Sequence, residues 1–155
     1  MELGSYNIDV AVITETHLKA RHSPSLIKID GYNIIRRDRL KRQRGDVAVI
    51  ARCEYPATEI VMEGDVREHE ILWVQILMPR GYVVVGALYH PPKPIYPTDG
   101  LLQQLESNVE TISGDFPDSL IILAGDLNSL SDSQVVQANG LVYLWSINRR
   151  VALQS

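Results

Sequence analysis

The feature that most constrains the fold is a series of short apolar segments that follow one another between turn residues. Some of them, such as VVVGAL (83–88) and LIILA (120–124), are apolar at successive positions rather than at alternate ones. Strands of this kind are covered on both faces, as in the interior of a layered α/β protein. Seven strands are predicted on this basis: Ile8–Thr14, Tyr32–Arg37, Asp46–Arg52, Thr58–Met62, Ile71–Leu77, Tyr82–Tyr89 and Leu120–Ala124.

A helix is predicted between the last two strands. It begins at Thr98, a residue type that caps helix N-termini, and ends at Gly114, a residue type that ends helices. Its apolar residues recur at helical spacing, at Leu101, Leu105, Val109 and Ile112. A strand, a helix and a strand in this order indicate a crossover between parallel strands. The segments KARHSPSLIKIDG (19–31) and HPPKPIYPTDG (90–100) are predicted to be loops.

Composition narrows the class of protein. A chain of 155 residues, 45% hydrophobic and 22% charged, can fold as one globular domain, which excludes a wholly disordered or fibrous chain. The formal net charge of −4 gives no overall attraction for nucleic acid, so such binding needs a local basic patch. The single Cys53 cannot form an internal disulfide and favours a reducing, intracellular setting. We expect no signal peptide and no membrane span, because no apolar run approaches about 18 residues.

Polar side chains stand where three of the predicted strands end. Glu15 ends the first strand, Asp126 and Asn128 follow LIILAG, and Tyr89 and His90 follow VVVGAL. If these ends converge, two carboxylates, an amide, a phenol and an imidazole share one cleft. Carboxylate oxygens, water and a phosphate are the ligands that Mg²⁺ prefers, and a metal there would polarise a phosphoryl oxygen. Asn128 would orient the attacking water or the phosphate without adding negative charge.

Each of these residues also has an ordinary structural interpretation. An Asp after Gly at a strand end is usually a turn residue or a helix cap, and Glu15 alone is most often a solvated acid. Tyr89 would then be an aromatic residue at the rim, with its hydroxyl in water. The histidines are expected at the surface or behind the site, with His22 and His69 both at the surface.

Four motifs nevertheless favour the functional interpretation of these residues over the ordinary structural one. ITETHL (13–18), GDVAVIAR (45–52), VVVGALYHPP (83–92) and IILAGDLNS (121–129) occur in this order. Together they resemble the endonuclease/exonuclease/phosphatase superfamily, and most of all the endonuclease domain of non-long-terminal-repeat retrotransposons. The resemblance runs from about residue 6 to about residue 141, so we expect one partial domain over residues 1–141 and a divergent tail over 142–155. It implies a four-layer α/β sandwich with two mixed β-sheets, like that of deoxyribonuclease I, and hydrolysis of phosphodiester bonds.

The resemblance implies a role for each matched residue. Glu15 corresponds to the metal-binding glutamate, and Tyr89 to the tyrosine that contacts the scissile phosphate. Asp126 and Asn128 correspond to the pair that polarises the attacking water and steadies the transition state, with Asp126 also a ligand of the metal. The implied cofactor is Mg²⁺, with Mn²⁺ as the substitute, and the implied partner is DNA. Action on chromosomal DNA would place the protein in the nucleus.

The sequence departs from the family pattern at both ends. The family begins with a strand that carries a catalytic asparagine, whereas this chain starts almost at the strand of Glu15. The family ends with a Ser-Asp-His segment, and here the chain closes with SINRRVALQS (146–155). We therefore expect an incomplete sandwich and weak or no turnover. Two interpretations stay open: a Mg²⁺-dependent DNA endonuclease domain, and a non-catalytic remnant that keeps the fold and DNA binding. A phosphatase of the same superfamily is a weaker third.

The basic segment RRDRLKRQR (36–44) is the one candidate for a local nucleic-acid contact. It holds six of the 15 Lys and Arg residues of the chain. Arg39, Lys41 and Arg42 are the residues expected to contact phosphates, in a non-specific and salt-sensitive way. The alternative is a solvated loop between two strands whose charges keep an edge soluble.

Overall fold

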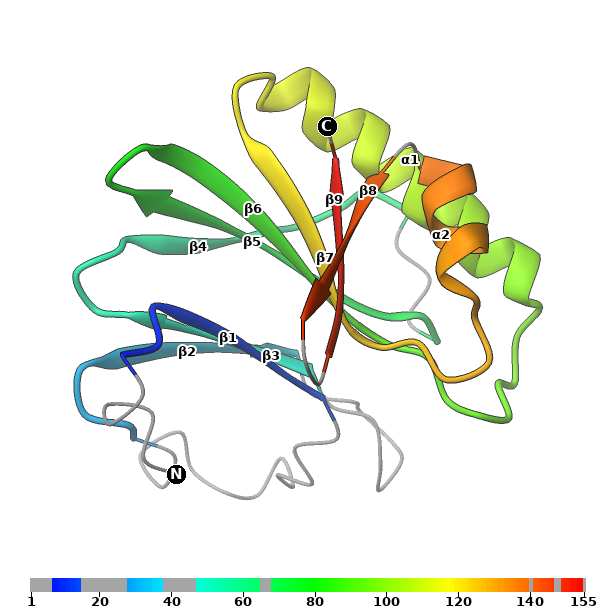
Figure 1. Ribbon diagram of the computed structural model, residues 1–155, viewed down its shortest axis with the longest axis horizontal. Helices are drawn as coiled ribbons and strands as arrows, with labels where there is room; N and C mark the ends of the chain where they lie inside the picture. Colours follow the sequence, from blue (N-terminus) through cyan, green and yellow to red (C-terminus); the bar gives the residue numbers. More distant parts are fainter. Residues whose placement is uncertain are drawn as a thin grey trace.

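Two β-sheets packed face to face form the body of the protein (Figure 1). The computed structural model describes residues 7–14, 28–37, 47–64, 68–139, 141–146 and 149–154. The smaller sheet is antiparallel and has the strand order β1-β3-β2. Its strands are β1 (Val10–Thr14), β2 (Tyr32–Arg37) and β3 (Val47–Arg52).

The larger sheet has six strands in the order β4-β5-β6-β7-β9-β8. Its strands are β4 (Ala57–Ile60), β5 (Glu70–Met78), β6 (Gly81–Tyr89), β7 (Leu120–Asp126), β8 (Leu141–Ser146) and β9 (Arg149–Gln154). β5 and β6 form a hairpin, and β6 and β7 are parallel. The helix α1 (Thr98–Asp115) connects the parallel pair, so the predicted crossover is confirmed.

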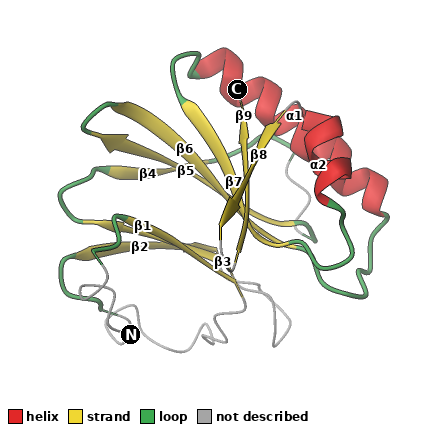
Figure 2. Cartoon of the chain, viewed as in Figure 1, coloured by secondary structure: helices red, strands yellow, loops and turns green. Residues whose placement is uncertain are grey.

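The two helices cover the outer face of the larger sheet (Figure 2). The predicted apolar stripe of α1 is buried against β5, β6 and β7, and the shorter α2 (Asp132–Asn139) adds Val135 to the same core. Burying one Leu side chain contributes about 1.5–3 kcal/mol, so the α1 stripe fixes the crossover firmly on the sheet. Gly86 of β6 lies under the Trp73 ring, because a Cβ there would be 2.4 Å from Trp73 Cζ3.

A second core fills the space between the sheets. Its residues alternate along β3, β5 and β6 and come from both inner faces: Val47, Val49, Ala51, Leu72, Val74, Ile76, Val85, Ala87 and Tyr89. β5 and β6 therefore have helix on one face and sheet on the other. This arrangement explains why their sequences are continuously apolar, as predicted for doubly covered strands. The described residues supply three layers of an α/β sandwich: helices, the larger sheet and the smaller sheet.

The predicted elements are present with small shifts at their ends, but some details were wrong. Thr98 is the first residue of α1 rather than its cap; the N-cap is Pro97, which makes no side-chain capping bond. Gly114 lies within the last turn, and the C-cap is Phe116. α2, β8 and β9 were not predicted at all. Among the described residues, no helix is both long and apolar enough to cross a membrane.

Candidate active site

The site is built where the parallel strands β6 and β7 end together. Tyr89 and Asp126 are register partners on the two strands, so their side chains leave the same face of the sheet, the one turned toward the smaller sheet. The backbone N–H of His90 donates a hydrogen bond to the Asp126 carbonyl oxygen (2.8 Å), which extends the pairing one residue further. Parallel strands thus bring two motifs 37 residues apart to one edge of the sheet.

Gly125 shapes the end of β7. Its φ of 145° lies in a region that side chains rarely adopt, and a Cβ there would lie 1.8 Å from the Leu88 carbonyl oxygen. Only glycine lets the two backbones approach so closely at this point. The glycine of the Gly-Asp pair is therefore required by the close approach of β6 and β7.

The turn after β7 holds the polar side chains in fixed positions. Leu127 and Leu130 are buried in the α1 core, whereas Asp126 and Asn128 point the other way. Asn128 has a left-handed φ of 44°, and its backbone N–H donates to Asp126 Oδ1 (3.1 Å). Asn128 Nδ2 donates to the His90 carbonyl oxygen (2.7 Å). Because a carbonyl can only accept, this bond also fixes which side of the amide carries Oδ1.

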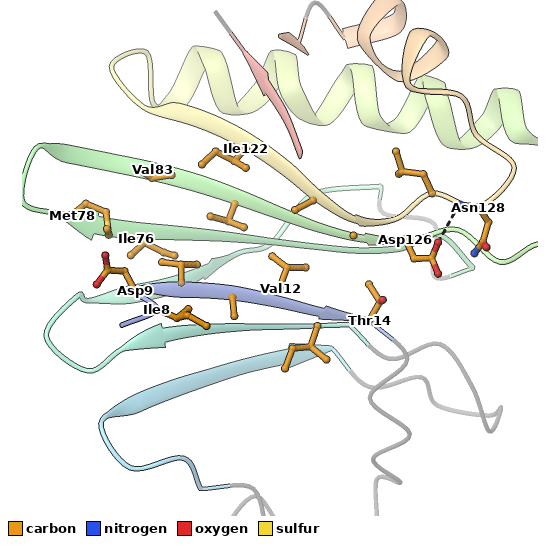
Figure 3. A pocket seen from close by; sticks show the side chains of 17 residues that line it. Ile8, Asp9, Val12, Thr14, Ile76, Met78, Val83, Ile122, Asp126 and Asn128 are labelled. Atoms are coloured by element: carbon orange, nitrogen blue, oxygen red, sulfur yellow. Dashed lines mark hydrogen bonds between the residues drawn. The ribbon is translucent and has the colours of Figure 1, made fainter. Parts of the chain in front are cut away.

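A groove of about 1100 Å³ opens beside this turn, between β1 and the strands β5, β6 and β7. Figure 3 shows Asp126 and Asn128 at the same end of the groove as Thr14, with Asp9 at the opposite end. Between these ends the walls are mainly aliphatic, and they come from both sheets. Both ends of the groove are polar, but Asp9 is paired with Arg52 (3.2 Å), so the end with Asp126 and Asn128 is the candidate site.

The other predicted site residues have different placements. Tyr89 is only 5% exposed and belongs to the core between the sheets, so it does not line the groove. Glu15 lies outside the described residues, directly after Thr14 in the sequence. Arg39, Lys41 and Arg42 also lie outside them. Of the predicted set, the structure therefore brings together Asp126 and Asn128, with Tyr89 beside them in the adjacent strand.

Glu70 is a buried residue to which the sequence assigned no role. It is the register partner of Tyr89, so Glu70, Tyr89 and Asp126 form a row across β5, β6 and β7 on one face of the sheet. Two strand spacings separate the main chains of the two carboxylates by roughly 10 Å. That separation is too large for side chains standing side by side to share one ion bound at about 2.1 Å.

Two histidines are buried behind the turn: His90, which was expected at the surface or behind the site, and His69, which was expected at the surface. His90 is 0% exposed; its Nδ1 is 3.0 Å from the Tyr96 hydroxyl, and its Nε2 is 3.3 Å from Ser129 Oγ. Burial lowers the pKa of His90, as does His69, while Asp126 acts in the opposite direction. The surface placement predicted for His69 was wrong, because its ring packs edge-on against Tyr96 and is 4% exposed.

The donor set at the end of the groove with Asp126 and Asn128 is suited to a hard cation. Asp126 is partly exposed, and among the described residues its carboxylate has one hydrogen-bond donor, the Asn128 N–H. Carboxylate and amide oxygens are the ligands that Mg²⁺ prefers, usually with one or two carboxylates and several waters. No group of three or more His, Cys, Asp or Glu residues within the described ranges could hold a metal. Asp126 thus fits as one ligand of a site that needs a further acid.

Known proteins resemble this chain both in sequence pattern and in fold. A model of the endonuclease/exonuclease/phosphatase family matches residues 2–146, whereas no curated protein matches the chain. The endonuclease domain of TRAS1, a telomere-specific non-LTR retrotransposon, is similar, with 14% identity, a TM-score of 0.65 and coverage of 97% of this chain and 74% of that one.

Two further solved structures are similar. For the human Nocturnin catalytic domain with bound sulfate the identity is 11%, the TM-score 0.72, and the coverage 99% of this chain and 72% of that one. For D. rerio TDP2 complexed with single-strand DNA product, the identity is 15%, the TM-score 0.63, and the coverage 99% of this chain and 73% of that one. At such identities the likeness shows the fold, and it confirms the predicted α/β sandwich.

Proposed function

Because the chain belongs to the endonuclease/exonuclease/phosphatase family, we propose that it is a Mg²⁺-dependent phosphodiester hydrolase, a DNA endonuclease domain of retrotransposon origin. The observation that carries the proposal is the pair Asp126 and Asn128, fixed by hydrogen bonds at one end of the groove. The likeness to the TRAS1 endonuclease domain supports the retrotransposon assignment.

The proposed ligands of the metal are Asp126 and Glu15, with Mn²⁺ able to replace Mg²⁺. When bound, the metal would neutralise charge on the phosphate and on the leaving oxygen. The Asp126 carboxylate accepts a hydrogen bond from the attacking water, for which Oδ2 is open, while Oδ1 accepts the Asn128 N–H. The Asn128 amide, held by the His90 carbonyl, offers Oδ1 and its second N–H to the water and the phosphate.

Tyr89 is assigned to the scissile phosphate, because it stands next to Asp126 in the adjacent strand and on the same face. DNA is the proposed substrate, with Arg39, Lys41 and Arg42 as contacts to its phosphates. The D. rerio TDP2 structure with a bound single-strand DNA product is in keeping with a DNA substrate. Action on chromosomal DNA would require nuclear localisation.

The second candidate function is a non-catalytic remnant that keeps the fold and binds DNA. It is favoured by the burial of Tyr89, whose side chain is 5% exposed and lies in the core rather than on the groove wall. A phosphate could reach such a hydroxyl only if the groove opens near the end of β6.

Nicking of supercoiled plasmid by the purified chain tests the proposal. In line with the weak turnover expected from the sequence, we expect relaxed circles to form slowly in Mg²⁺, with no product in EDTA and none with Asp126→Ala. Asp118→Ala is the matched control, because Asp118 is an exposed carboxylate in the turn before β7. Binding of DNA without nicking in Mg²⁺ or Mn²⁺ would refute the endonuclease and leave the remnant. Release of phosphate from a monoester, without nicking, would instead identify a phosphatase.

A further inference from the structure

We infer that His90 is a positioning residue for Asn128: its buried imidazole braces the turn that presents Asp126 and Asn128 to the groove. The catalytic meaning of this role rests on the function proposed above. The geometric claim concerns the turn itself, and it can be tested on the protein without metal or DNA.

Two hydrogen bonds of the His90 main chain tie residue 90 to the turn: one to the main chain of Asp126, the other to the Asn128 side chain. The His90 N–H donates to the Asp126 carbonyl oxygen at 2.8 Å, and the His90 carbonyl accepts from Asn128 Nδ2 at 2.7 Å. The orientation of the Asn128 amide therefore follows the position of the main chain at residue 90. A shift of the main chain at residue 90 would therefore move the Asn128 amide and the main chain of Asp126.

The His90 ring is held on both of its nitrogens. Nδ1 lies 3.0 Å from the Tyr96 hydroxyl in the proline-rich loop, and Nε2 lies 3.3 Å from Ser129 Oγ in the turn. A neutral imidazole donates from one nitrogen and accepts at the other, and hydroxyl groups can fill either role. The ring thus bridges the loop and the turn, and it fixes residue 90 between them.

The loop side of this bridge is itself anchored on α1. Tyr96 packs edge-on against His69, with ring centroids 4.5 Å apart, and His69 Nδ1 contacts Gln104 Oε1 of α1. α1 is packed rigidly on the larger sheet by its buried stripe. A continuous set of contacts therefore runs from the helix, through two histidines and a tyrosine, to the turn.

Ser129 and His90 form a hydroxyl–imidazole pair, which elsewhere can act as a nucleophile and a base. Here the imidazole is fully buried and bonded at both nitrogens, so it has no face open to a substrate. Positioning is the role that this geometry fits. Small misplacements of reacting groups cost rate steeply, so the brace would matter to turnover.

Hydrogen exchange of the Asn128 side-chain amide tests the inference directly. The amide resonances of the ¹⁵N-labelled chain are assigned by their loss in Asn128→Asp, and exchange is measured in metal-free buffer. We expect one protected N–H in the native chain. Tyr96→Phe and Ser129→Ala each remove one hydrogen-bond partner of the ring, and each should speed exchange roughly fivefold, the effect of about one net hydrogen bond.

Conservative variants separate positioning from general stability. His90→Gln keeps a polar group near the Nε2 position and His90→Asn near the Nδ1 position, so each should restore part of the protection that His90→Ala loses. Tyr82→Phe is the matched control, since Tyr82 is 49% exposed and remote from the turn, and its exchange should equal that of the native chain. Unchanged exchange in both Tyr96→Phe and Ser129→Ala would overturn the inference.

Nicking assays distinguish this inference from the proposed function. If the native chain nicks DNA, we expect Tyr96→Phe to lower kcat with little change in KM, because the groove walls are untouched. If the native chain does not nick DNA, the proposed function fails, while altered exchange in the variants still supports the brace. Altered kcat without altered exchange would refute positioning through Asn128.

Discussion

Replacing Gly125 by alanine places a methyl group against the main chain of Leu88, the register partner of residue 125 in the parallel strand β6. The Cβ would stand 1.8 Å from the Leu88 carbonyl oxygen and 2.8 Å from its carbonyl carbon, and both are main-chain atoms of the register partner. A flexible side chain could turn aside, but a strand in the middle of the sheet cannot. The φ of 145° is also unfavourable for alanine.

The cost has two parts. Holding a non-glycine residue in such a region costs about 1–3 kcal/mol. Forcing extra volume into a packed interior costs about 1–3 kcal/mol more. We therefore expect Gly125→Ala to lower the free energy of unfolding by about 2–6 kcal/mol, a large share of the 5–15 kcal/mol typical of a domain. Because Asp126 is the next residue, its carboxylate should also leave its place in the groove.

Urea denaturation followed by circular dichroism measures this loss. Gly114→Ala is the matched control, because nothing lies within 4 Å of a Cβ built at Gly114, within the last turn of α1. That variant should be unchanged or up to about 1 kcal/mol more stable, since glycine weakens helices. If Gly125→Ala unfolded at the same urea concentration as the native chain, the close approach of β6 and β7 at this point would be wrong.

Leu105→Ala should cost about 2–5 kcal/mol in the same assay, because Leu105 is fully buried between α1 and the larger sheet; a loss below about 1 kcal/mol would contradict that packing. Changing Arg39, Lys41 and Arg42 together to alanine should weaken DNA binding. The slope of log affinity against log salt concentration should fall in magnitude by about 0.9 for each phosphate that is no longer neutralised. An unchanged slope would identify a solvated loop. Burial lowers the pKa of His90 below its ordinary value of 6.5, so as the pH falls the unfolded chain binds a proton at His90 before the folded chain does. The contribution of neutral His90 to the free energy of unfolding in metal-free buffer should therefore be fully present above pH 6.5 and be lost below it. His90→Asn should abolish that part of the pH dependence.

Most of the fold was predictable because its central strands are packed against other layers of the molecule and are therefore rich in apolar residues. The strands β3, β5 and β6 are buried on both faces, and β7 is buried on one face and half-buried on the other, so their apolar segments stand out from the sequence. α2 was missed because SDSQVVQAN contains few apolar residues at helical spacing. β9 was missed because RRVALQ has no strand pattern of its own, and its pairing with β7 is a tertiary contact. Pairing of this kind leaves little trace in local sequence.

The candidate site was predictable in part for a similar reason. Asp126 and Asn128 follow an apolar strand directly, so their place at its end can be read from the chain. The burial of His69 and His90 cannot, because partners distant in the sequence decide it: Gln104 for the first ring, and Ser129 for the second. A histidine beside prolines has no local signal that separates a solvated ring from one enclosed by a helix and a turn.

The register of β7 against β6 determines which β7 side chains pack in the core and which face the groove. It therefore limits the insertions and deletions that this strand tolerates. Leu123 faces α1 and Ala124 faces the smaller sheet, and the same alternation turns Asp126 toward the groove. Deletion of one codon within 120–124 would exchange the two faces of the strand, so that the carboxylate would be driven into the helix-covered core. Deletion of two codons would restore the faces in a shorter strand. Single-codon insertions and deletions should therefore be depleted in this segment among related sequences, whether or not they cut DNA.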